Sequence, residues 1–377
     1  MTSAELRPVR IGERLVGPGH GVYVIAEAGV NHNGDVSRAE TMCRAARDAG
    51  ADAVKFQAFR TDAFVSAQAR QTEYQAANTR RRQTQRDMLK GLELSPDDLR
   101  RLAEYCRSIE IEFLASPFDL TSLEVLLDIG VRAVKIASPE LTDAPLLRAA
   151  AAARRPLIMS TGAAEVTEIT EAVRLVRFDG CAEVILLHCL SVYPTPFELQ
   201  NLKAVQTLMD HFRCVVGYSD HSTELLSGRL AVTLGASVLE KHFTLSRDDT
   251  GPDHAMSLEP SELARYIAMA RDMPADLIEI IRGNERAQRA IGHGYILPHS
   301  LEAESREVSR KSLAARVDIS NGMILTRDML TTLRPGTGIS PMFLDRVIGA
   351  TTVTAIATGT LITEDMIVAQ SGDDEAS

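Results

Sequence analysis

Two histidines follow short apolar runs in the second half of the chain. His221 lies in "GYSDHST", and His242 lies in "VLEKHFTL", 21 positions further on. If the two runs are neighbouring strands, about 4.8 Å apart, both imidazoles can bind one divalent cation and leave positions open for substrate and water. Such a cation would act as a Lewis acid. The same side chains could instead hydrogen-bond to the nearby "SD" and "GPDH" residues, so the pair alone does not establish a metal site.

Polar side chains also close the other apolar runs of this part of the chain. A polar group at a buried strand end costs about 1–3 kcal/mol unless it is paired, so many such groups in one place indicate a ligand. Two lysines and several hydroxyls suit a phosphate or a carboxylate, because the ammonium groups supply charge and the hydroxyls supply directed hydrogen bonds. We therefore expect an anionic substrate at a site drawn from Glu27, Lys55, Gln57, Ser116, Lys135, Ser138, Glu140, Ser160, His188, Ser219, His221, Glu240, Lys241 and His242.

The elements that must position these residues repeat one theme. From Val22 to about Phe243, short β-branched apolar runs alternate with amphipathic stretches of helical spacing. There are eight runs: "VYVIAE", "AVKFQ", "IEFLAS", "AVKIAS", "PLIMS", "EVILLH", "CVVGYS" and "SVLEKHF". Eight alternations of strand and helix predict an α/β fold of the (β/α)8 TIM-barrel type, in which the carboxyl ends of the strands form the active site.

The chain is predicted to divide into three parts. We assign residues 1–283 to the catalytic barrel, residues 284–308 to a polar connector, and residues 309–377 to a small β-rich domain that ends in the acidic, disordered tail "SGDDEAS". The small domain holds two related pieces, each with a β-like run, a glycine turn and a short helix start. Within the barrel, the link from Ala58 to about Leu94 is long enough to form a lid.

Composition argues against several other classes of protein. The formal net charge of −10, the absence of Trp and the aromatic content of 5% disfavour nucleic acid as a partner, and the arginines of "TRRRQTQR" are interpreted as a solvated face. The apolar runs fall short of the roughly 18 residues of a membrane span, and the first residues lack a secretory signal, so we expect a cytoplasmic protein without membrane association. The five cysteines form no CxxC pair and are predicted to be reduced core residues.

A set of short motifs spans nearly the whole chain. In order, they are "VIAEAGVNHNGD", "AGADAVKFQ", "SPFD", "VKIASPE", "STGAA", "HCLSVYPTP", "GYSDHS", "LEKHFTL" and "GPDHAMSLEP". Their types and order resemble the sialic acid synthases, a family that makes N-acetylneuraminate, legionaminate and pseudaminate. The tail "RPGTGISPMFLDRVIG" is similar to the family's C-terminal antifreeze-like domain, also called SAF. The resemblance implies a TIM barrel followed by a SAF domain.

The resemblance also implies a reaction. Phosphoenolpyruvate would condense with the open-chain aldehyde of an N-acylated mannosamine-type sugar. A divalent metal, Mn²⁺ with Mg²⁺ or Co²⁺ as alternatives, would polarise the aldehyde oxygen and be held by His221 and His242. Carbon C3 of phosphoenolpyruvate would attack the carbonyl, water would add at C2, and phosphate would leave by C–O cleavage.

Roles for the remaining residues follow from the same resemblance. The residues that match the family's phosphoenolpyruvate site are Lys55, Lys135, Ser138, Ser160, Ser191 and Ser219. Those that match its sugar site are Gln57, Asn78 and Tyr193, together with Glu27 and Asp253, which would also be catalytic carboxylates beside the acid or base Glu140. Arg334 would reach from the SAF domain of one chain to the sugar's N-acyl group in a partner's barrel, which implies a domain-swapped homodimer.

Several alternatives remain open at this point. We expect N-acetylmannosamine as the sugar and N-acetylneuraminate as the product, and the alternative is legionaminate synthesis from 2,4-diacetamido-2,4,6-trideoxymannose. A Schiff-base aldolase is a second enzymatic hypothesis, because Lys55, Lys135 and Lys241 all lie at strand ends. A non-catalytic binding protein is a third, since a SAF domain can bind ice and a barrel can persist as a scaffold.

Overall fold

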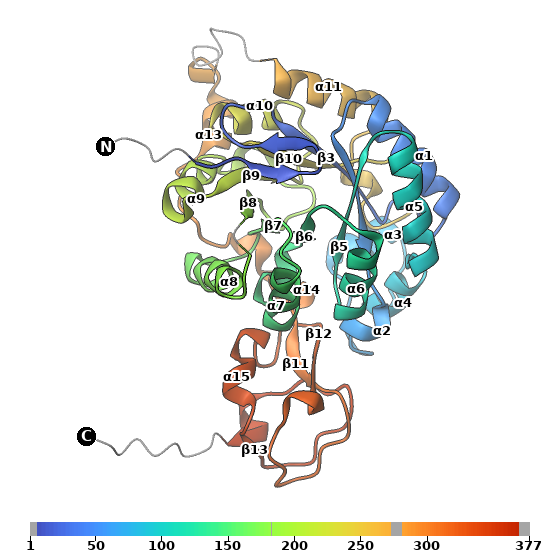
Figure 1. The fold of residues 1–377 in the computed structure, drawn as a ribbon, viewed down its shortest axis with the longest axis vertical. Coiled ribbons are helices and arrows are strands. Elements are labelled where there is room, and N and C mark those ends of the chain that lie inside the picture. The colour runs from blue at the N-terminus through green and yellow to red at the C-terminus, as the bar shows by residue number, and fades with distance from the viewer. Residues whose placement is uncertain (1–5, 182, 273–280, 369–377) are drawn as a thin grey trace, which may run out of the picture.

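Eight strands form one parallel sheet that curves into a barrel (Figure 1). The structure, a computed structural model, describes residues 6–181, 183–272 and 281–368, so the predicted acidic tail lies outside the described residues. The strands are β3 (Tyr23–Gly29), β4 (Ala53–Ala58), β5 (Glu112–Pro117), β6 (Val134–Ile136), β7 (Leu157–Ser160), β8 (Val184–His188), β9 (Val215–Asp220) and β10 (Val238–His242). Each coincides with one predicted apolar run, and the prediction of a TIM barrel is confirmed.

The strand order follows the chain around the barrel. The hydrogen-bonded order is β5-β4-β3-β10-β9-β8-β7-β6. The two ends of this series, β5 and β6, lie next to each other, and no continuous ladder joins them in the described residues. The barrel is therefore nearly closed, with one seam between β5 and β6.

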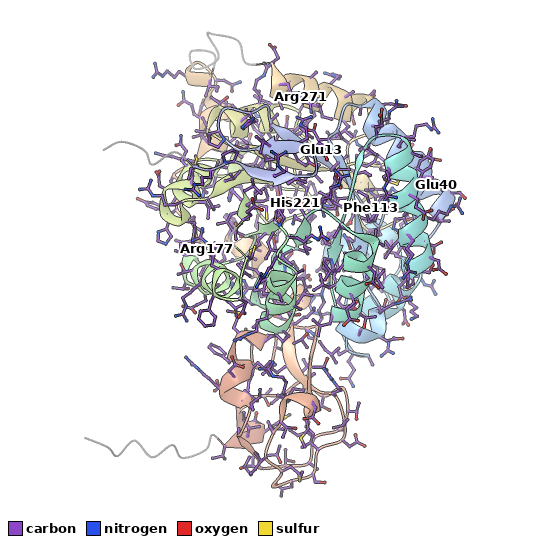
Figure 2. All side chains as sticks on the ribbon, viewed as in Figure 1. Glu13, Glu40, Phe113, Arg177, His221 and Arg271 are labelled. Carbon is purple, nitrogen blue, oxygen red and sulfur yellow. The ribbon has the colours of Figure 1, made fainter. Side chains whose placement is uncertain are left out.

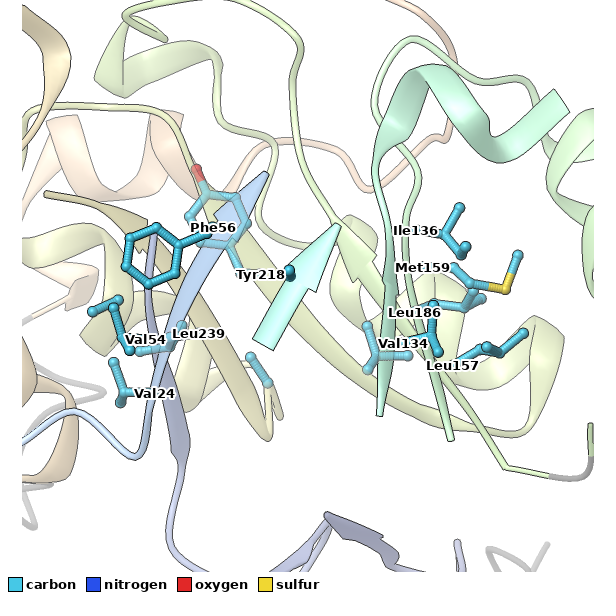
Figure 3. Packing of buried hydrophobic residues seen from close by; sticks show 14 of the residues in the cluster. Val24, Val54, Phe56, Val134, Ile136, Leu157, Met159, Leu186, Tyr218 and Leu239 are labelled. Carbon is cyan, nitrogen blue, oxygen red and sulfur yellow. The ribbon is translucent and has the colours of Figure 1, made fainter. Parts of the chain in front are cut away.

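Helices cover the outer face of the barrel. They are α1 (Val36–Asp48), α5 (Pro96–Ser108), α6 (Leu120–Ile129), α7 (Ala144–Ala152), α8 (Val166–Phe178), α9 (Ala204–Phe212), α10 (Leu226–Thr233) and α11 (Pro260–Arg271). Several of these helices begin with an N-cap residue, whose side chain accepts hydrogen bonds from the backbone N–H groups of the first turn. Asp35 is the N-cap of α1, and Ser95 is the N-cap of α5. Apolar side chains on the outer faces of the strands, among them Val54, Phe56 and Leu239, pack beneath the helices (Figure 3).

The amino-terminal end of the barrel is filled by apolar side chains. Strands β1 (Val9–Ile11) and β2 (Arg14–Val16) form an antiparallel hairpin. Val9, Ile11 and Val16 of this hairpin pack against inward-facing strand residues such as Ile25 and Leu114. This apolar plug closes one end of the barrel and leaves the polar residues at the opposite, carboxyl-terminal end.

Additional segments gather at the carboxyl-terminal end. The long link after β4 contains α2 (Thr61–Phe64), α3 (Glu73–Thr79) and α4 (Gln85–Lys90), which we call the lid. The connector contains α13 (Glu285–Ile291) and α14 (Ala303–Ser309). It leads to the C-terminal domain, which lies beyond this end of the barrel (Figure 1).

The C-terminal domain has its own small core. Its elements are β11 (Ser312–Ala315), β12 (Leu330–Leu333), α15 (Leu344–Val347), β13 (Thr351–Thr352) and β14 (Ile367–Val368). Leu313, Leu325 and Ile362 are among the apolar residues that pack inside it. The two predicted related pieces are both present: each has a glycine with positive φ, Gly322 at 79° and Gly359 at 80°, followed by a short 3-10 helix.

Two further predictions can be compared with the described part of the chain. None of its helices combines the length and the apolar character that crossing a membrane requires. All five cysteines are buried and lack a disulfide partner there, which agrees with the prediction of reduced core residues.

Candidate active site

A cavity opens at the carboxyl ends of the strands. Of the residues singled out from the sequence for a role, the lining includes Glu27, Lys55, Gln57, Lys135, Ser138, Ser160, Ser191, Tyr193, Ser219, His221, His242, Asp253 and Arg334. Ser116 and Glu240, which were predicted strand-end residues without an assigned role, line it as well. His188 does not, because its Nε2 atom lies 2.8 Å from the Gln200 carbonyl oxygen beneath the connector.

Alternation along the strands decides which polar residues reach the cavity. Successive side chains of a strand face opposite sides, so Glu240 and His242 point inward while Lys241 points toward the helices. Lys241 Nζ lies 2.9 Å from Asp220 Oδ2 and 5.2 Å from the centre of the Tyr266 ring on α11. Lys241, one of the three lysines considered for a Schiff base, therefore lies outside the cavity.

Four buried ionisable side chains meet at the base of the cavity, and we call them the charged cluster. They are Glu27 on β3, Lys55 on β4, Lys135 on β6 and Glu240 on β10. Lys55 Nζ lies 2.6 Å from Glu27 Oε2, 3.6 Å from Glu240 Oε2 and 3.2 Å from Ser116 Oγ. Lys135 Nζ lies 3.7 Å from Glu240 Oε1. Glu240 thus connects two lysines that come from opposite sides of the seam between β5 and β6.

The charged cluster sets two lysines against two carboxyl groups. Although burial raises the pKa of Glu240, Lys135 and Lys55 bring it below its ordinary value, so this carboxylate is ionised. Burial raises the pKa of Glu27 to about 7, against the lowering effect of Lys55. Although burial disfavours the Lys55 cation, Glu240 and Glu27 raise its pKa above the ordinary value, whereas burial lowers the pKa of Lys135. Uptake of a proton by Glu27 would leave the cluster with more positive than negative charge, which favours an anionic ligand.

Hydroxyl groups surround the charged cluster. Lys135 Nζ donates to Ser160 Oγ at 2.7 Å, and Ser219 Oγ donates to Glu240 Oε1 at 2.9 Å. Ser160 only accepts in this bond and keeps its own O–H for a ligand, whereas Ser219 donates its O–H to Glu240 and keeps acceptor capacity alone. The combination of ammonium groups and hydroxyls is the kind of environment that binds phosphate or carboxylate oxygens.

A glycine brings the backbone close to two more hydroxyls. Gly162 N donates to Ser138 Oγ at 3.0 Å. A Cβ atom at position 162 would clash with Ser191 Oγ and would lie 2.9 Å from Ser138 Oγ, so only glycine fits without a shift. The loop after β7 therefore packs directly against the serines that end β6 and β8.

Two histidines, His221 and His242, line the cavity, and His221 lies in the middle of the barrel domain (Figure 2). The ring centres of His221 and His242 are 5.6 Å apart. His221 Nδ1 lies 2.5 Å from the Leu190 carbonyl oxygen, so Nδ1 carries the proton and donates it, and Nε2 keeps its lone pair. His242 Nδ1 is buried and lacks a hydrogen-bond partner among the described residues.

Both imidazoles are in the form that binds metal ions. Burial lowers the pKa of His221 to about 4, and burial together with His221 lowers the pKa of His242 well below its ordinary value. Neutral imidazoles with free nitrogen atoms fit a divalent cation. Within the described residues, no group of three or more His, Cys, Asp and Glu side chains is placed to hold a metal. These two histidines would therefore be joined by water or substrate oxygens.

Aromatic and polar side chains of the lid cover the cavity. Tyr74 from α3 packs on Tyr193 with ring centres 5.1 Å apart, and Tyr193 lies 4.4 Å from the His221 ring centre. Asn78, although predicted to hold a sugar, is not among the lining residues, and its Nδ2 atom donates to the Pro252 carbonyl oxygen at 2.6 Å. Asn78 ties the lid to the loop that carries the neighbouring Asp253.

Glu140 lies behind the wall of the cavity. It is fully buried and is not among the lining residues. Lys311 Nζ lies 2.6 Å from Glu140 Oε2 and 2.7 Å from Asp143 Oδ2, and Arg334 Nη2 lies 3.5 Å from Glu140 Oε1. Burial raises the pKa of Glu140, and Lys311 and Arg334 oppose this shift without cancelling it. In this position Glu140 holds two cations that arrive with the C-terminal domain.

Arg334 closes the cavity from the C-terminal domain of the same chain. Its guanidinium carbon lies 4.8 Å from the ring centre of Phe64 and 5.2 Å from that of Phe118. The buried Nε atom lacks a partner among the described residues, which leaves it available to a ligand oxygen. The family resemblance implied that the C-terminal domain of a partner chain supplies Arg334. In the single chain, the connector instead places the C-terminal domain, and with it Arg334, against the barrel of the same chain.

Some lining residues carried no sequence signal. No role was assigned to Phe64, Met88 and Leu89 of the lid, or to Arg306 of α14 and Arg310 directly after it. Lys311, at the start of the C-terminal domain, was not assigned a role either. Glu240 was singled out as a strand-end residue, and its alternation with Lys241 is the signal that it faces the cavity.

By fold and site, the chain is a barrel enzyme that binds an anionic substrate, since buried cations and hydroxyls converge at the carboxyl ends of parallel strands. Comparison with known proteins identifies the family to which the chain belongs. The NeuB family matches residues 42–281, and the SAF domain matches residues 310–368. The chain belongs to the NeuB family, the sialic acid synthase family that its motifs resemble.

Individual relatives agree with this assignment. The N,N'-diacetyllegionaminic acid synthase of Legionella pneumophila is 39% identical over 90% of this chain and 93% of its own length. The Campylobacter jejuni protein of the same name is 40% identical over 86% of this chain and 94% of its own length. The crystal structure of the Bacillus subtilis spore coat polysaccharide biosynthesis protein SpsE superposes with a TM-score of 0.81 at 32% identity, covering 96% of this chain and 99% of that one.

Asp253→Asn is expected to stabilise the ligand-free protein above about pH 7. Burial raises the pKa of Asp253 to about 7 in the folded state, whereas the unfolded value is about 4. The folded state therefore binds more protons between these pH values, and the free energy of unfolding falls as the pH rises through this window. The asparagine substitution removes this loss, so the free energy of unfolding at pH 8 should be about 1–3 kcal/mol higher in the variant than in the native protein.

Urea unfolding of both proteins between pH 4 and pH 8 measures the effect. Asp248→Asn, at an exposed position of the same loop, serves as the control and should keep the native pH dependence. An Asp253→Asn protein with the same pH dependence as the native one would contradict the expectation.

Proposed function

We propose that the chain condenses phosphoenolpyruvate with the open-chain form of 2,4-diacetamido-2,4,6-trideoxymannose to give N,N'-diacetyllegionaminic acid and phosphate. The observation that carries the reaction class is the charged cluster, in which Lys55 and Lys135 lie among hydroxyls beside two neutral histidines. This arrangement can hold a doubly anionic small molecule at the base of the cavity and leave room for a carbonyl partner near the lid.

The base of the cavity suits phosphoenolpyruvate. Lys55 and Lys135 supply positive charge, and Ser138 and Ser160 supply donors for phosphate and carboxylate oxygens. Burial makes these contacts stronger than they would be in water. Fixed between them, the C3 carbon of phosphoenolpyruvate would face the sugar aldehyde, and this positioning is itself a large part of catalysis.

The choice of sugar rests on the lid and on the relatives. Phe64, Met88 and Leu89 give the lid side of the cavity an apolar surface beside the polar Tyr74 and Gln75. An apolar wall accepts the methyl group of a 6-deoxy sugar, whereas the C6 hydroxyl of N-acetylmannosamine would lose its hydrogen bonds to water there. The two relatives named as N,N'-diacetyllegionaminic acid synthases favour the same sugar. This replaces N-acetylmannosamine, the first expectation from the sequence.

Two carboxyl groups have pKa values near 7 and can carry the protons. The electron pair of the phosphoenolpyruvate double bond forms the new C–C bond, the aldehyde oxygen takes up a proton, and water adds to C2 with loss of another. Asp253, which lines the cavity and is protonated below pH 7, would supply the first proton. Glu27, in its ionised form bound to Lys55, would accept the second, and phosphate then leaves by C–O cleavage. Glu140 keeps Arg334 oriented toward the sugar's N-acyl oxygen.

A divalent metal, Mn²⁺ or alternatively Mg²⁺ or Co²⁺, is part of this proposal. His221 Nε2 and a nitrogen of His242 would hold it, since both rings are neutral and the Leu190 carbonyl fixes the His221 tautomer. When bound, the cation supplies Lewis acidity toward a carbonyl oxygen.

The working form is proposed to be a homodimer in which the C-terminal domains are exchanged. In the single chain, Tyr295, Leu297 and Leu301 of the connector are 69%, 73% and 52% exposed. Apolar side chains clustered on one exposed segment favour contact with a partner. An exchanged domain would bring Arg334 and Lys311 to the partner's Glu140 and needs only a different path of the connector.

Phosphate release tests the reaction and the sugar together. With phosphoenolpyruvate and Mn²⁺, the trideoxy sugar is expected to give a specificity constant at least about tenfold above that of N-acetylmannosamine, because the C6 hydroxyl is left unpaired. N-acetylmannosamine 6-phosphate should be the poorest of the three. A higher constant for N-acetylmannosamine would restore the first expectation, and no release with any of the sugars would contradict the reaction.

His221→Ala tests the metal site. Removal of one of two protein ligands should weaken Mn²⁺ binding by at least about a hundredfold. Calorimetric titration with Mn²⁺ measures this without turnover, and circular dichroism checks the fold. His211→Ala, at an exposed position on α9, is the control. Unchanged affinity in the His221 variant would remove this residue from the metal site.

Mixed dimers test the exchange of domains. Arg334→Ala and Lys135→Met should each be poorly active, because each damages the same site from a different domain. When the two variants are co-expressed in equal amounts, half of the dimers would contain one chain of each. Each mixed dimer would have one intact site of its two, so about a quarter of the native number of sites would be restored. If Arg334 acts on its own barrel, every site keeps a lesion, and mixed dimers verified by mass would be no more active than the parents.

A further inference from the structure

A buried carboxylate of the connector touches two loops of the active site. Glu302, which precedes α14, is 3% exposed. Its Oε1 atom accepts hydrogen bonds from Ala163 N and Ser191 N, both at 2.7 Å. Its Oε2 atom accepts one from His299 N at 2.7 Å. Three backbone donors thus satisfy the carboxylate, and two of them belong to the barrel.

These two donors lie next to the residues that surround the charged cluster. Ala163 N belongs to the loop after β7, which starts at Ser160 and contains Gly162. Gly162 N in turn donates to Ser138 Oγ. Ser191 N belongs to the loop after β8, and Ser191 itself lines the cavity. One carboxylate oxygen therefore links the loop that follows Ser160 and contacts Ser138 through Gly162 with the loop that carries Ser191.

The loop after β7 has a backbone conformation that needs support. Ala163 has a φ of 52°, in the left-handed region that side chains other than glycine disfavour. Its carbonyl oxygen accepts from Arg306 Nη1 at 2.5 Å and from Arg310 Nη2 at 2.9 Å. The connector thus holds both the N–H and the C=O of this residue.

The two arginines are fixed by a carboxylate of the barrel. Arg306 Nη2 lies 2.7 Å from Glu168 Oε1, and Arg310 also pairs with Glu168. Although burial raises the pKa of Glu168, hydrogen bonds from Arg310 and Arg306 lower it to about 2, so the carboxylate stays ionised. Glu168 lies in the first turn of α8, directly after the loop. The middle of the loop and the start of the helix that follows it are therefore both fastened to the segment 302–310.

The charge of Glu302 argues that its part is geometric. A buried anion next to an anion-binding cavity repels the ligand, so Glu302 cannot promote binding by its own field. Its effect must come from the position of the groups that it holds. A carboxylate that accepts two backbone N–H bonds fixes them more firmly than a neutral acceptor would, because such bonds are shorter and stronger.

We propose that Glu302 is a positioning residue for the phosphate-binding side of the cavity: it holds the loops after β7 and β8 at the separation at which Ser138, Ser160 and Ser191 can bind one phosphate group together. The identity of the phosphate compound as phosphoenolpyruvate rests on the proposed function. The connector would then be part of the substrate site as well as the link to the C-terminal domain.

Steady-state kinetics of Glu302→Ala and Glu302→Gln test this proposal. In the alanine variant, KM for phosphoenolpyruvate should rise about tenfold or more, as expected when binding groups are displaced, while KM for the sugar stays within about twofold. The glutamine variant keeps an oxygen for the two N–H groups and should recover most of the affinity. Glu307→Gln, on the exposed side of α14 and paired with Arg70, is the matched control and should behave as the native protein.

A binding measurement separates this proposal from the proposed reaction. Inorganic phosphate should raise the melting temperature of the native protein and of Glu307→Gln, and this shift should be lost in Glu302→Ala, whatever the sugar substrate proves to be. If phosphate still shifts the melting temperature of the alanine variant as it does that of the native protein, or if both KM values rise equally, the proposal is overturned. If the alanine variant fails to fold, the glutamine variant decides. A glutamine variant with the native phosphate response and the native KM for phosphoenolpyruvate supports the proposal. A glutamine variant that has the native melting temperature but loses both the phosphate response and the affinity for phosphoenolpyruvate overturns it. A native protein that responds to phosphate but releases none from phosphoenolpyruvate would contradict the proposed function and leave this test intact.

Discussion

The charged cluster is the constraint on which the rest of the site depends. Burying Glu27, Lys55, Lys135 and Glu240 together is costly unless each charge finds an opposite partner within a few ångströms. Glu240 meets this requirement for two lysines at once, at 3.6 Å and 3.7 Å. Because Lys135 comes from β6, Lys55 from β4 and Glu240 from β10, this pairing crosses the interior of the barrel and connects strands on the two sides of the seam between β5 and β6. Side-chain electrostatics therefore link parts of the barrel that are far apart in its backbone hydrogen-bonding order.

Much of the barrel and many of the lining residues could be predicted from the sequence because both follow local rules. Each strand is a short apolar run, and a polar residue at its carboxyl end faces the cavity or the helices according to whether its position is odd or even. Glu240 and His242 enter the cavity by this rule, and Lys241 leaves it. A list of strand-end residues cannot by itself separate those that face the cavity from those that face the helices. The orientation of each strand about its own axis, which decides this, is set by packing.

The residues that sequence analysis misplaced or missed depend on contacts between distant segments. Lys311 meets Glu140, and Glu302 meets Ala163, across well over a hundred residues of chain. Nothing in the composition of segment 284–311 distinguishes these two side chains from its other charged residues. Asn78 was placed at the sugar by the family resemblance, but its hydrogen bond to Pro252 depends on how the lid folds over the barrel. These contacts depend on how the connector and the lid pack against the barrel, and the local sequence does not determine that packing.

The apolar plug formed by β1 and β2 has a consequence for the order of events. With Val9, Ile11 and Val16 filling the amino-terminal end, the cavity described here is reached from the side of the lid and the C-terminal domain. The charged cluster lines it together with Tyr74 of the lid and Arg334 of the C-terminal domain. In the proposed reaction, a sugar bound beneath the lid and the C-terminal domain would block the way to Lys55 and Lys135. The anionic substrate would then enter before the sugar, and the product would leave before the position at the two lysines is filled again.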